Sequence, residues 1–387
     1  MPTPAATRKV MIIAGETSGD RLAARAIREA NEQAARTGRD VKFFGIGGDR
    51  CKAEGMQCDY DTTQMSVVGF LEVAKRYGFF RSVFATMVSR LDDPATRPDV
   101  ILLVDYPGFN IRFAAEAKKR GIEVIYYVSP QVWAWKPKRV RKIVASVNRM
   151  LVIFPFEQNI YTNAGLAATE FVGHPLIEIL DEERRSFVSR EEFARTHSLD
   201  ASKRWLLLFP GSRSEEVRRH LPIMAEAARL FATDAAVETI VVESANIDPS
   251  AYSSAGNGVV HFRSPNDVHQ LMTHGYHGIL KSGTTTLEAA IAGLPGVICY
   301  RTSWLTYFMA RALVKLNYIG LANIVLGKML YPEVLQHAMT PLKLAETLRS
   351  IDAGRDAFVQ ELSSFRAKLA SDRSAPSLRV AQYLLGS

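Results

Sequence analysis

The sequence is poor in the residues and patterns that mark secreted, metal-binding and membrane-spanning proteins. Its 387 residues include three cysteines, Cys51, Cys58 and Cys299, whose odd number and spacing fit neither a disulfide framework nor a paired metal site. No apolar run approaches the roughly 18 residues that a membrane-spanning helix needs. The polar start, residues 1–8, is not followed by the apolar core of a signal peptide. These absences favour a protein of a reducing cytoplasm.

Two further patterns are absent. There is no G-x-G-x-x-G turn with a well-placed acid for a ribose, which disfavours a nicotinamide-dependent dehydrogenase. No nucleic-acid recognition module is visible either. The net charge of +8 is therefore compatible with phosphates, nucleic acid or an anionic membrane, and does not choose among them.

What the chain does contain is a repeated order of short apolar segment, glycine-bearing turn and amphipathic helix. The expected strands are Lys9–Ala14, Val41–Gly45, Val100–Val104, Val124–Val128 and Met150–Ile153, then Trp205–Phe209, Thr239–Val242, Val259–Phe262, His277–Leu280 and Gly296–Tyr300. Continuous apolar runs of this kind are typical of parallel strands that are buried on both faces. The expected fold is α/β, with two tandem Rossmann-like doubly wound domains.

The boundaries follow from length and composition. A chain of 387 residues is long enough for two domains, and the polar stretch Asp181–Lys203 separates the two series of strands. We expect an N-terminal domain of residues 1–180 and a C-terminal domain of residues 181–340. The remaining residues, 341–387, predict three short helices that pack against the domains.

In a parallel sheet, ligands bind beyond the carboxyl ends of the strands, so loops that follow strands are the candidate sites. The first such loop is Gly15–Asp20, in which two glycines permit a tight turn and the helix start offers free N–H groups. Its candidate binding residues are Gly15, Glu16 and Ser18. The alternative is a plain turn in which Ser18 caps the helix.

Two loops of the second half are the strongest phosphate-binding candidates. In Pro210–Arg213, Gly211 permits close backbone approach, Ser212 brings a hydroxyl, and Arg213 supplies a forked cation at a helix start. The alternative is a loop with a solvated arginine.

The second of these loops, Ser282–Glu288, has the same strand–loop–helix setting. Ser282, Gly283 and Thr284 form a small hydroxyl-rich cradle, and Glu288 is placed to accept hydrogen bonds from a ribose diol. The alternative is a capping box with a solvated glutamate.

Two candidate catalytic positions lie in the first half. Asp105 ends the strand Val100–Val104, where a carboxylate is well placed for general-base work, although an aspartate there equally often starts a turn. His174 lies before a proline and is either directed at a ligand or structural.

The stretch Val73–Leu91 has no acidic residue and carries an apolar helical stripe flanked by basic residues. The stripe comprises Val73, Tyr77, Phe80, Phe84 and Met87, widened by Phe79 and Val83, with Lys75, Arg76, Arg81 and Arg90 beside it. This pattern favours an interfacial helix on anionic lipid over a core helix. The basic residues 138–142 after Trp133 and Trp135 add a second such patch.

Taken together, the motifs resemble those of the lipid-A-disaccharide synthases over nearly the whole chain. The matching segments are Ala14–Asp20, Phe44–Asp49, Met65–Glu72, Val104–Asn110, Tyr127–Trp135, Phe154–Glu157, Phe171–Pro175, Pro210–Arg213, Ser282–Glu288 and Asn323–Gln336. The resemblance implies the two-Rossmann GT-B architecture and a hexosyltransferase that inverts configuration without metal or other cofactor. The implied donor is UDP-2,3-diacylglucosamine, the acceptor is 2,3-diacylglucosamine 1-phosphate, and the product is the β-1,6-linked lipid A disaccharide 1-phosphate.

The resemblance also implies residue roles. Asp105 takes the catalytic-aspartate position and Arg213 that of the arginine that handles UDP. The implied nucleotide site comprises Ser212, Ser282, Gly283, Thr284, Glu288 and Asn323, with Gly211 in the same loop.

Further implications concern the membrane and a partner subunit. Family members are peripheral inner-membrane proteins of Gram-negative-type cells that dimerise by exchanging C-terminal helices. We therefore expect a cytoplasmic homodimer, with residues 341–387 packing across domains or exchanged in the dimer. The stretch Met65–Val88 is the natural candidate for the acyl groove. Its candidate membrane and acyl contacts are Val67, Val68, Phe70, Leu71, Phe79, Phe80 and Phe84.

Three residues depart from the family pattern. Ala322 and Glu243 stand where proline is usual, and Lys281 replaces a small residue. Lys281 either adds a phosphate contact or points to solvent. Two rival functions remain: a UDP-sugar 2-epimerase of the same fold, and a non-catalytic nucleotide-sugar-binding membrane protein.

Overall fold

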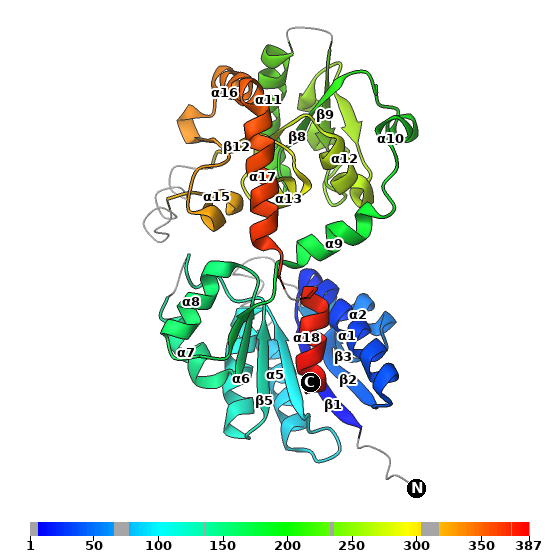
Figure 1. Cartoon of the computed structure of the whole chain (residues 1–387), viewed down its shortest axis with the longest axis vertical. Coiled ribbons are helices and arrows are strands. Elements are labelled where there is room, and N and C mark those ends of the chain that lie inside the picture. Colours follow the sequence, from blue (N-terminus) through cyan, green and yellow to red (C-terminus); the bar gives the residue numbers. More distant parts are fainter. Residues whose placement is uncertain are drawn as a thin grey trace. The chain divides into compact units, whose positions relative to one another are not determined.

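The computed structural model describes residues 7–65, 77–134, 137–232, 236–302, 317–372 and 374–386. The chain forms two compact units: unit 1 comprises residues 1–175 and 371–387, and unit 2 comprises residues 176–370. Each is a parallel sheet with helices on its faces (Figure 1). The expected α/β fold with two tandem doubly wound sheets is therefore confirmed.

Unit 1 contains a seven-stranded parallel sheet of order β3-β2-β1-β4-β5-β6-β7. Its strands are β1 (Arg8–Ala14), β2 (Val41–Gly47), β3 (Gln57–Asp61), β4 (Val100–Val104), β5 (Glu123–Tyr127), β6 (Arg149–Val152) and β7 (Thr169–Phe171). Its helices are α1 (Thr17–Thr37), α2 (Asp49–Ala53), α3 (Thr62–Met65), α5 (Tyr77–Asp92), α6 (Pro107–Lys119), α7 (Arg139–Ser146), α8 (Pro155–Asn163) and α18 (Pro376–Leu385).

Unit 2 contains a six-stranded parallel sheet of order β10-β9-β8-β11-β12-β13. Its strands are β8 (Arg204–Phe209), β9 (Val237–Val242), β10 (Val260–Phe262), β11 (His277–Lys281), β12 (Gly296–Tyr300) and β13 (Glu333–Leu335). Its α-helices are α9 (Pro175–Arg184), α10 (Arg190–His197), α11 (Ser214–Phe231), α12 (Val268–His274), α13 (Thr284–Ala292), α15 (Leu321–Leu326), α16 (Pro341–Ala353) and α17 (Arg355–Leu369).

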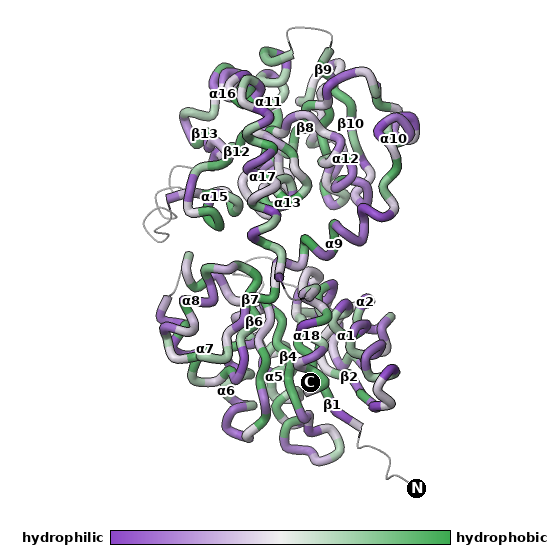
Figure 2. The backbone as a smooth tube through the Cα atoms, viewed as in Figure 1, coloured by the Kyte–Doolittle hydropathy of each residue, from purple (hydrophilic) through white to green (hydrophobic). Residues whose placement is uncertain are grey.

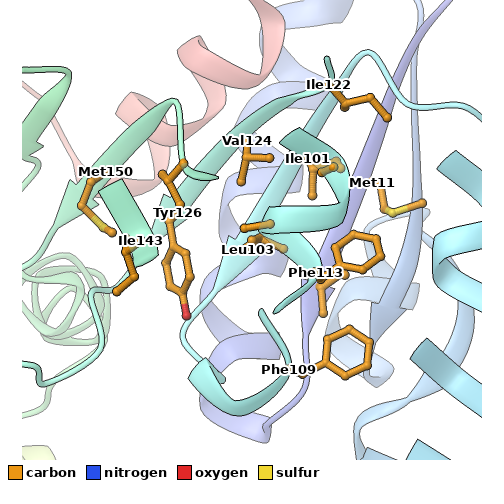
Figure 3. Packing of buried hydrophobic residues seen from close by; sticks show 14 of the residues in the cluster. Met11, Ile101, Leu103, Phe109, Phe113, Ile122, Val124, Tyr126, Ile143 and Met150 are labelled. Atoms are coloured by element: carbon orange, nitrogen blue, oxygen red, sulfur yellow. The ribbon is translucent and has the colours of Figure 1, made fainter. Parts of the chain in front are cut away.

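The central strands of both units are mainly hydrophobic, as Figure 2 shows for β4, although β1 begins with the polar residues Arg8 and Lys9. Every residue of β4 is buried, because helices cover both faces of the sheet. On one face, Phe109 and Phe113 of α6 pack toward Met11 and Leu103 of the strands (Figure 3). Burying each such side chain contributes roughly 1.5–3 kcal/mol, so the core fixes which strand edge carries the loops.

All ten strands expected from apolar runs are present, within two residues at each end. Three strands were not predicted: β3, β7 and β13, each of which lies at an edge of its sheet. Their sequences, QCDYD, TEF and EVL, are short and rich in polar residues. These three segments therefore contain no continuous apolar run that marks them as strands, whereas β10, the other edge strand of the second sheet, was predicted.

The C-terminal tail does form three helices, but the two units share it. Helices α16 and α17 belong to unit 2, whereas α18 belongs to unit 1, where it packs against α1. Arg379 of α18 makes a bidentate ion pair with Glu170, with nitrogen–oxygen distances of 2.8 and 3.1 Å. The polar stretch 181–203, expected to be the junction, lies within unit 2.

Helix α5 is packed differently from the membrane-facing helix that the sequence favours. Val83, Met87 and Leu91 are fully buried in the core of unit 1. The Phe84 ring packs against Phe109 and Phe113, with centroid distances of 5.3 and 6.1 Å. The apolar stripe of residues 77–92 is therefore mainly a core stripe, which was the alternative interpretation.

Phe79 and Phe80 are also partly buried against this core, and Phe79 lies edge-on to Tyr60. The other candidate acyl contacts, Val67, Val68, Phe70 and Leu71, lie outside the described residues. None of the helices in the described part of the chain has both the length and the apolar character needed to cross a membrane.

The docking of α18 onto unit 1 can be tested with Leu384, which is fully buried. Leu384→Ala should lower the free energy of unfolding of unit 1 by about 2–4 kcal/mol, because it leaves a cavity against α1. Hydrogen exchange read by mass spectrometry should then show faster exchange in β1 and β2, with β8 and β9 unchanged. The exposed Leu342→Ala is the control and should alter neither unit. Faster exchange confined to β8 and β9 would contradict the assignment of α18.

Candidate functional site

The strand order of each sheet reverses at one point, and the predicted loops lie there. In unit 1 the reversal is between β1 and β4, and in unit 2 between β8 and β11. Ala14 pairs with Val104 and Phe209 with Leu280, so the residues that follow these pairs are neighbours at the carboxyl edge. Gly15 therefore adjoins Asp105, and Pro210 adjoins Lys281. This is the position at which doubly wound sheets bind ligands.

Asp105 lies on a strained turn between β4 and α6. Asp105 and Tyr106 have positive φ angles of 46° and 48°, a conformation that non-glycine residues rarely adopt. The buried Asn110 side chain holds the turn, because its Nδ2 donates to the Asp105 carbonyl at 2.8 Å. The Tyr126 hydroxyl donates to the same carbonyl at 2.6 Å. Hydrogen bonds from neighbouring elements thus hold Asp105 and Tyr106 in this unfavourable backbone conformation. Strained residues that are held in this way often lie at functional sites.

The pKa of the Asp105 carboxyl lies well above its ordinary value. Burial, with a smaller contribution from the negative charge of Glu16, raises its pKa from 3.8 to about 6. A carboxyl with such a pKa is deprotonated near neutral pH and still gains a proton readily. This property suits a general base.

The Gly15 loop fits closely around the Asp105 turn. A Cβ atom at Gly15 would lie 2.5 Å from the Tyr106 ring, so glycine is needed for the two loops to meet. Glu16 is the N-cap residue of α1, and both Glu16 and Ser18 are exposed. Ser18 lies inside the first turn, so the alternative in which it caps the helix is not what forms.

The buried Asp20 is structural, because it accepts from the N–H groups of Gly48 and Cys51.

His174 and Glu157 are both buried in unit 1. Burial lowers the pKa of His174 to about 3, so the ring is neutral, and it packs 5.2 Å from the Phe154 ring. This supports the structural interpretation of His174.

Burial raises the pKa of Glu157 to about 7, although the Glu157 carboxylate accepts from Trp133 Nε1 at 3.1 Å and from Phe154 N–H at 3.2 Å. Through its bond to Phe154 N–H, Glu157 satisfies the N-cap backbone at the start of α8.

In unit 2, the loop 210–213 enters α11 with Arg213 as the N-cap residue. The Ser212 N–H donates to Glu216 Oε2 at 3.1 Å, and Arg213 Nη1 lies 3.5 Å from Glu216 Oε1. Lys281 Nζ is 2.8 Å from the same Oε1. The Lys281 side chain therefore does not point to solvent, which was one of the two expectations for it. It forms an ion pair with a glutamate that the sequence did not single out.

The same loop is tied to the end of β12 by the buried His220. Its Nδ1 lies 2.9 Å from the Pro210 carbonyl, and its Nε2 lies 3.1 Å from the Arg301 N–H. Nε2 also lies 3.0 Å from the Arg301 carbonyl, so both ring nitrogens contact the backbone of the segments that they join. Burial lowers the pKa of His220, which favours the neutral ring.

The loop 282–286 enters α13 after β11. The Ser282 hydroxyl donates to the Ile319 carbonyl at 3.0 Å, and Thr286 Oγ1 donates to the Gly283 carbonyl at 2.8 Å. Thr284 is exposed at the helix start, and Glu288 is partly buried one turn further on. The expected strand–loop–helix setting is therefore present.

Asn323 is fully buried, and its side chain is engaged within the protein. Nδ2 donates to the Tyr331 carbonyl and to Glu333, at 2.7 and 2.8 Å. Oδ1 accepts from the N–H groups of Leu330 and Tyr331, both at 2.9 Å. All four hydrogen-bonding positions of the amide are filled. The Asn323 side chain therefore holds the surrounding loop.

Glu333 was not predicted, and it supports the same loop by accepting from the N–H groups of Ile319 and Gly320. Its only sequence clue is its place in the motif Asn323–Gln336. For metals, no three His, Cys, Asp or Glu side chains gather as ligands within the described ranges.

The structural relatives define the class of protein. The Neisseria meningitidis UDP-GlcNAc 2-epimerase, solved with UDP-GlcNAc bound, is similar with a TM-score of 0.62 at 10% identity, covering 98% of both chains. The calicheamicin glycosyltransferase CalG4 has a TM-score of 0.61 at 13% identity, covering 98% of this chain and 100% of its own. The fold is thus that of the two-domain GT-B glycosyltransferases and epimerases.

Sequence comparison narrows this class. The model of the lipid-A-disaccharide synthetase family matches residues 10–374. The lipid-A-disaccharide synthase of Trichlorobacter lovleyi is 39% identical over 369 residues, covering 94% of this chain and 93% of its own. That of Geobacter metallireducens is 38% identical over 347 residues, covering 88% and 87%. The chain belongs to the lipid-A-disaccharide synthase family and is a hexosyltransferase.

The raised pKa of Asp105 predicts a pH-dependent stability. The folded-state pKa of about 6 exceeds the ordinary 3.8, so the carboxyl favours the folded state at low pH and penalises it once pH rises through 6. Asp105→Asn should therefore raise the free energy of unfolding by about 1–2 kcal/mol more at pH 8 than at pH 5. Thermal or urea unfolding at both pH values measures this difference.

Asp61 provides the matched control, because Lys52 and Thr63 lower its pKa to about 2. Asp61 is ionised throughout this range, so Asp61→Asn should reduce stability equally at pH 5 and pH 8. An equal effect of Asp105→Asn at both pH values would show that the pKa of Asp105 is not raised.

Proposed function

We propose that this hexosyltransferase transfers 2,3-diacylglucosamine from its UDP derivative to 2,3-diacylglucosamine 1-phosphate, with inversion. The products are the β-1,6-linked disaccharide 1-phosphate of lipid A and UDP. The observation that carries the proposal is Asp105, an acid of pKa about 6 held by a strained turn at the switch point of unit 1. A nucleotide-binding protein without catalysis has no need of such a strained, proton-accepting group.

The proposed donor site is built on unit 2. Gly211, Ser212 and Arg213 bind the diphosphate at the start of α11, where N–H groups and an exposed guanidinium are available. Ser282, Gly283 and Thr284 complete the cradle, and Glu288 accepts hydrogen bonds from the ribose. Asn323 acts indirectly by holding the loop that receives the Ser282 hydroxyl.

The proposed reaction is a single displacement. The acceptor's 6-hydroxyl oxygen attacks the anomeric carbon from the face opposite UDP, and the bond from that carbon to the phosphate oxygen breaks. The electron pair leaves with UDP, and the proton of the hydroxyl passes to Asp105. Arg213 and the helix N-terminus stabilise the charge that develops on the diphosphate. Gly15, Glu16 and Ser18, which adjoin Asp105, are proposed to position the acceptor.

We further propose that the protein is cytoplasmic and acts on the surface of the inner membrane of a Gram-negative-type cell. The acyl chains of its substrates require an apolar surface, and Val67, Val68, Phe70 and Leu71 are the candidates. Tyr77, at the start of α5, is 64% exposed, which supports contact at this end of the helix. Phe79, Phe80 and Phe84, the other candidates, are partly buried against the core of unit 1. We also propose a homodimer that exchanges C-terminal helices, since residues 370–375 link α17 to a separately docked α18.

The activity is tested directly with purified protein in detergent, the acylated UDP donor and the acylated 1-phosphate acceptor. Mass spectrometry should detect the disaccharide 1-phosphate and UDP in equal amounts, and only when both substrates are present. Absence of the disaccharide product would contradict the proposal. Epimerisation of a UDP-sugar without acceptor would support the rival epimerase instead.

The base assignment predicts that Asp105→Asn lowers kcat by roughly 10²–10⁴-fold, because an amide cannot accept the proton. The wild-type kcat/KM should rise with pH up to about 6 and then level off, and the variant should lose this limb. Asp99→Asn is the matched control, since Asp99 lies before the amino end of β4, where its side chain accepts from Lys9 N–H. Near-normal turnover of Asp105→Asn would remove Asp105 from the mechanism.

A further inference from the structure

Glu216 occupies the hydrogen-bond donors that a diphosphate would use. Its Oε2 accepts from Ser212 N–H, and its Oε1 faces Arg213 Nη1 and Lys281 Nζ. A Cβ atom at Gly211 would lie 2.6 Å from Oε2, so the glycine is what lets the carboxylate lie against the loop. With its φ of 136°, Gly211 also holds a backbone that other residues adopt only with strain.

The two oxygens of this carboxylate are bound with different strength. Oε1 forms a close ion pair with Lys281, in which the two side chains are 17% and 13% exposed. Oε2 makes one neutral-donor hydrogen bond of 3.1 Å to Ser212 N–H. The Arg213 contact, at 3.5 Å and with 74% of that side chain exposed, is weak because solvent screens it. Releasing Ser212 and Arg213 therefore costs little, whereas releasing Lys281 does not.

The stronger bond between Glu216 and Lys281 bears on whether Lys281 binds phosphate itself or holds Glu216 in place. If Lys281 bound phosphate itself, it would leave Glu216 as a largely buried and unpaired carboxylate, which is strongly unfavourable. Lys281 also lies over the Tyr300 ring, 5.3 Å from its centroid, and this position holds the ammonium beside Glu216. Burial alone would raise the pKa of Glu216, but Lys281 outweighs it and keeps the pKa below its ordinary value. Glu216 is thus a permanent anion at the loop.

We propose that Glu216 is an internal ligand that fills the diphosphate donors of the 211–213 loop when nucleotide is absent, and that Lys281 retains Glu216 when the diphosphate displaces it. The inference rests on the proposed donor site and adds a regulator of its affinity. The incoming phosphate takes Ser212 N–H and Arg213, while Glu216 keeps its bond to Lys281. The remaining negative charge weakens the hold on UDP, which favours its release after transfer.

The test uses calorimetric titration of the full-length protein with UDP and with uridine, which lacks the diphosphate. Glu216→Gln should lower the Kd for UDP about tenfold, because a unit of like charge near the phosphates is removed, and should leave the Kd for uridine unchanged. The matched control is Glu226→Gln, an exposed glutamate of the same helix that pairs with Arg229. It should change neither Kd. In turnover assays, Glu216→Gln should show stronger product inhibition by UDP.

Lys281 gives a second, independent test. Lys281→Met should raise the Kd for UDP about tenfold, because Glu216 then turns fully onto Ser212 and Arg213. The double variant Glu216→Gln/Lys281→Met should bind UDP about as tightly as Glu216→Gln alone, because Lys281 acts only through its ion pair with Glu216. The double variant also removes both charges of the ion pair, so that no unpaired buried charge destabilises the fold.

Each contrary result is distinct. A double variant about tenfold weaker than Glu216→Gln, which is the factor expected for Lys281→Met in the wild type, would make Lys281 a direct phosphate ligand and overturn the inference. So would an unchanged or weaker UDP affinity in folded Glu216→Gln, or an equal gain for uridine. Failure of the wild type to bind UDP at all would instead overturn the proposed donor site, and the inference with it.

Discussion

Parallel pairing of every strand is the constraint on which both units depend. It buries each strand between layers of helices and sends all carboxyl ends to one edge of the sheet. Where the strand order reverses, adjacent loops diverge to opposite faces, and functional residues gather there. Asp105 with Gly15, and Arg213 with Ser282, are two instances of the same geometry within one chain. Because the chain belongs to the lipid-A-disaccharide synthase family, the reaction at these loops is the joining of two sugars.

The pKa values of two acidic side chains, Asp105 in unit 1 and Glu216 in unit 2, are shifted in opposite directions. In unit 1, burial and a neighbouring glutamate raise the pKa of Asp105, so this acid exchanges its proton near neutral pH. In unit 2, Lys281 keeps the pKa of Glu216 low, so that acid stays charged. A proton acceptor needs the first environment, and a fixed counter-ion needs the second. Burial is common to both, and the nearest charge determines the outcome.

Much of this arrangement was predictable, for identifiable reasons. Central strands such as β4 are apolar throughout, and glycine with hydroxyl residues after a strand marks a ligand loop, so both could be found from local sequence. The pairing of Glu216 with Lys281 could not, because it joins two loops that meet only once β8 and β11 pair. Helical periodicity likewise revealed the stripe of α5 but not the phenylalanines of α6 that cover part of it. Asn323 lies in a recognisable motif, yet only the surrounding hydrogen bonds show that its amide is engaged inside the protein.

The assignment of α18 to unit 1 has a consequence for synthesis of the chain. Unit 1 is built from residues 1–175 and 371–387, so unit 2 is in effect inserted within it. As the chain leaves the ribosome, the first sheet emerges long before the helix that covers α1. Unit 2 has all its residues available earlier and is the first unit able to complete its core. The apolar side chains beneath α18 therefore stay uncovered until α18 itself has been synthesised. In this interval the nascent chain is most exposed to aggregation or to capture by a second copy.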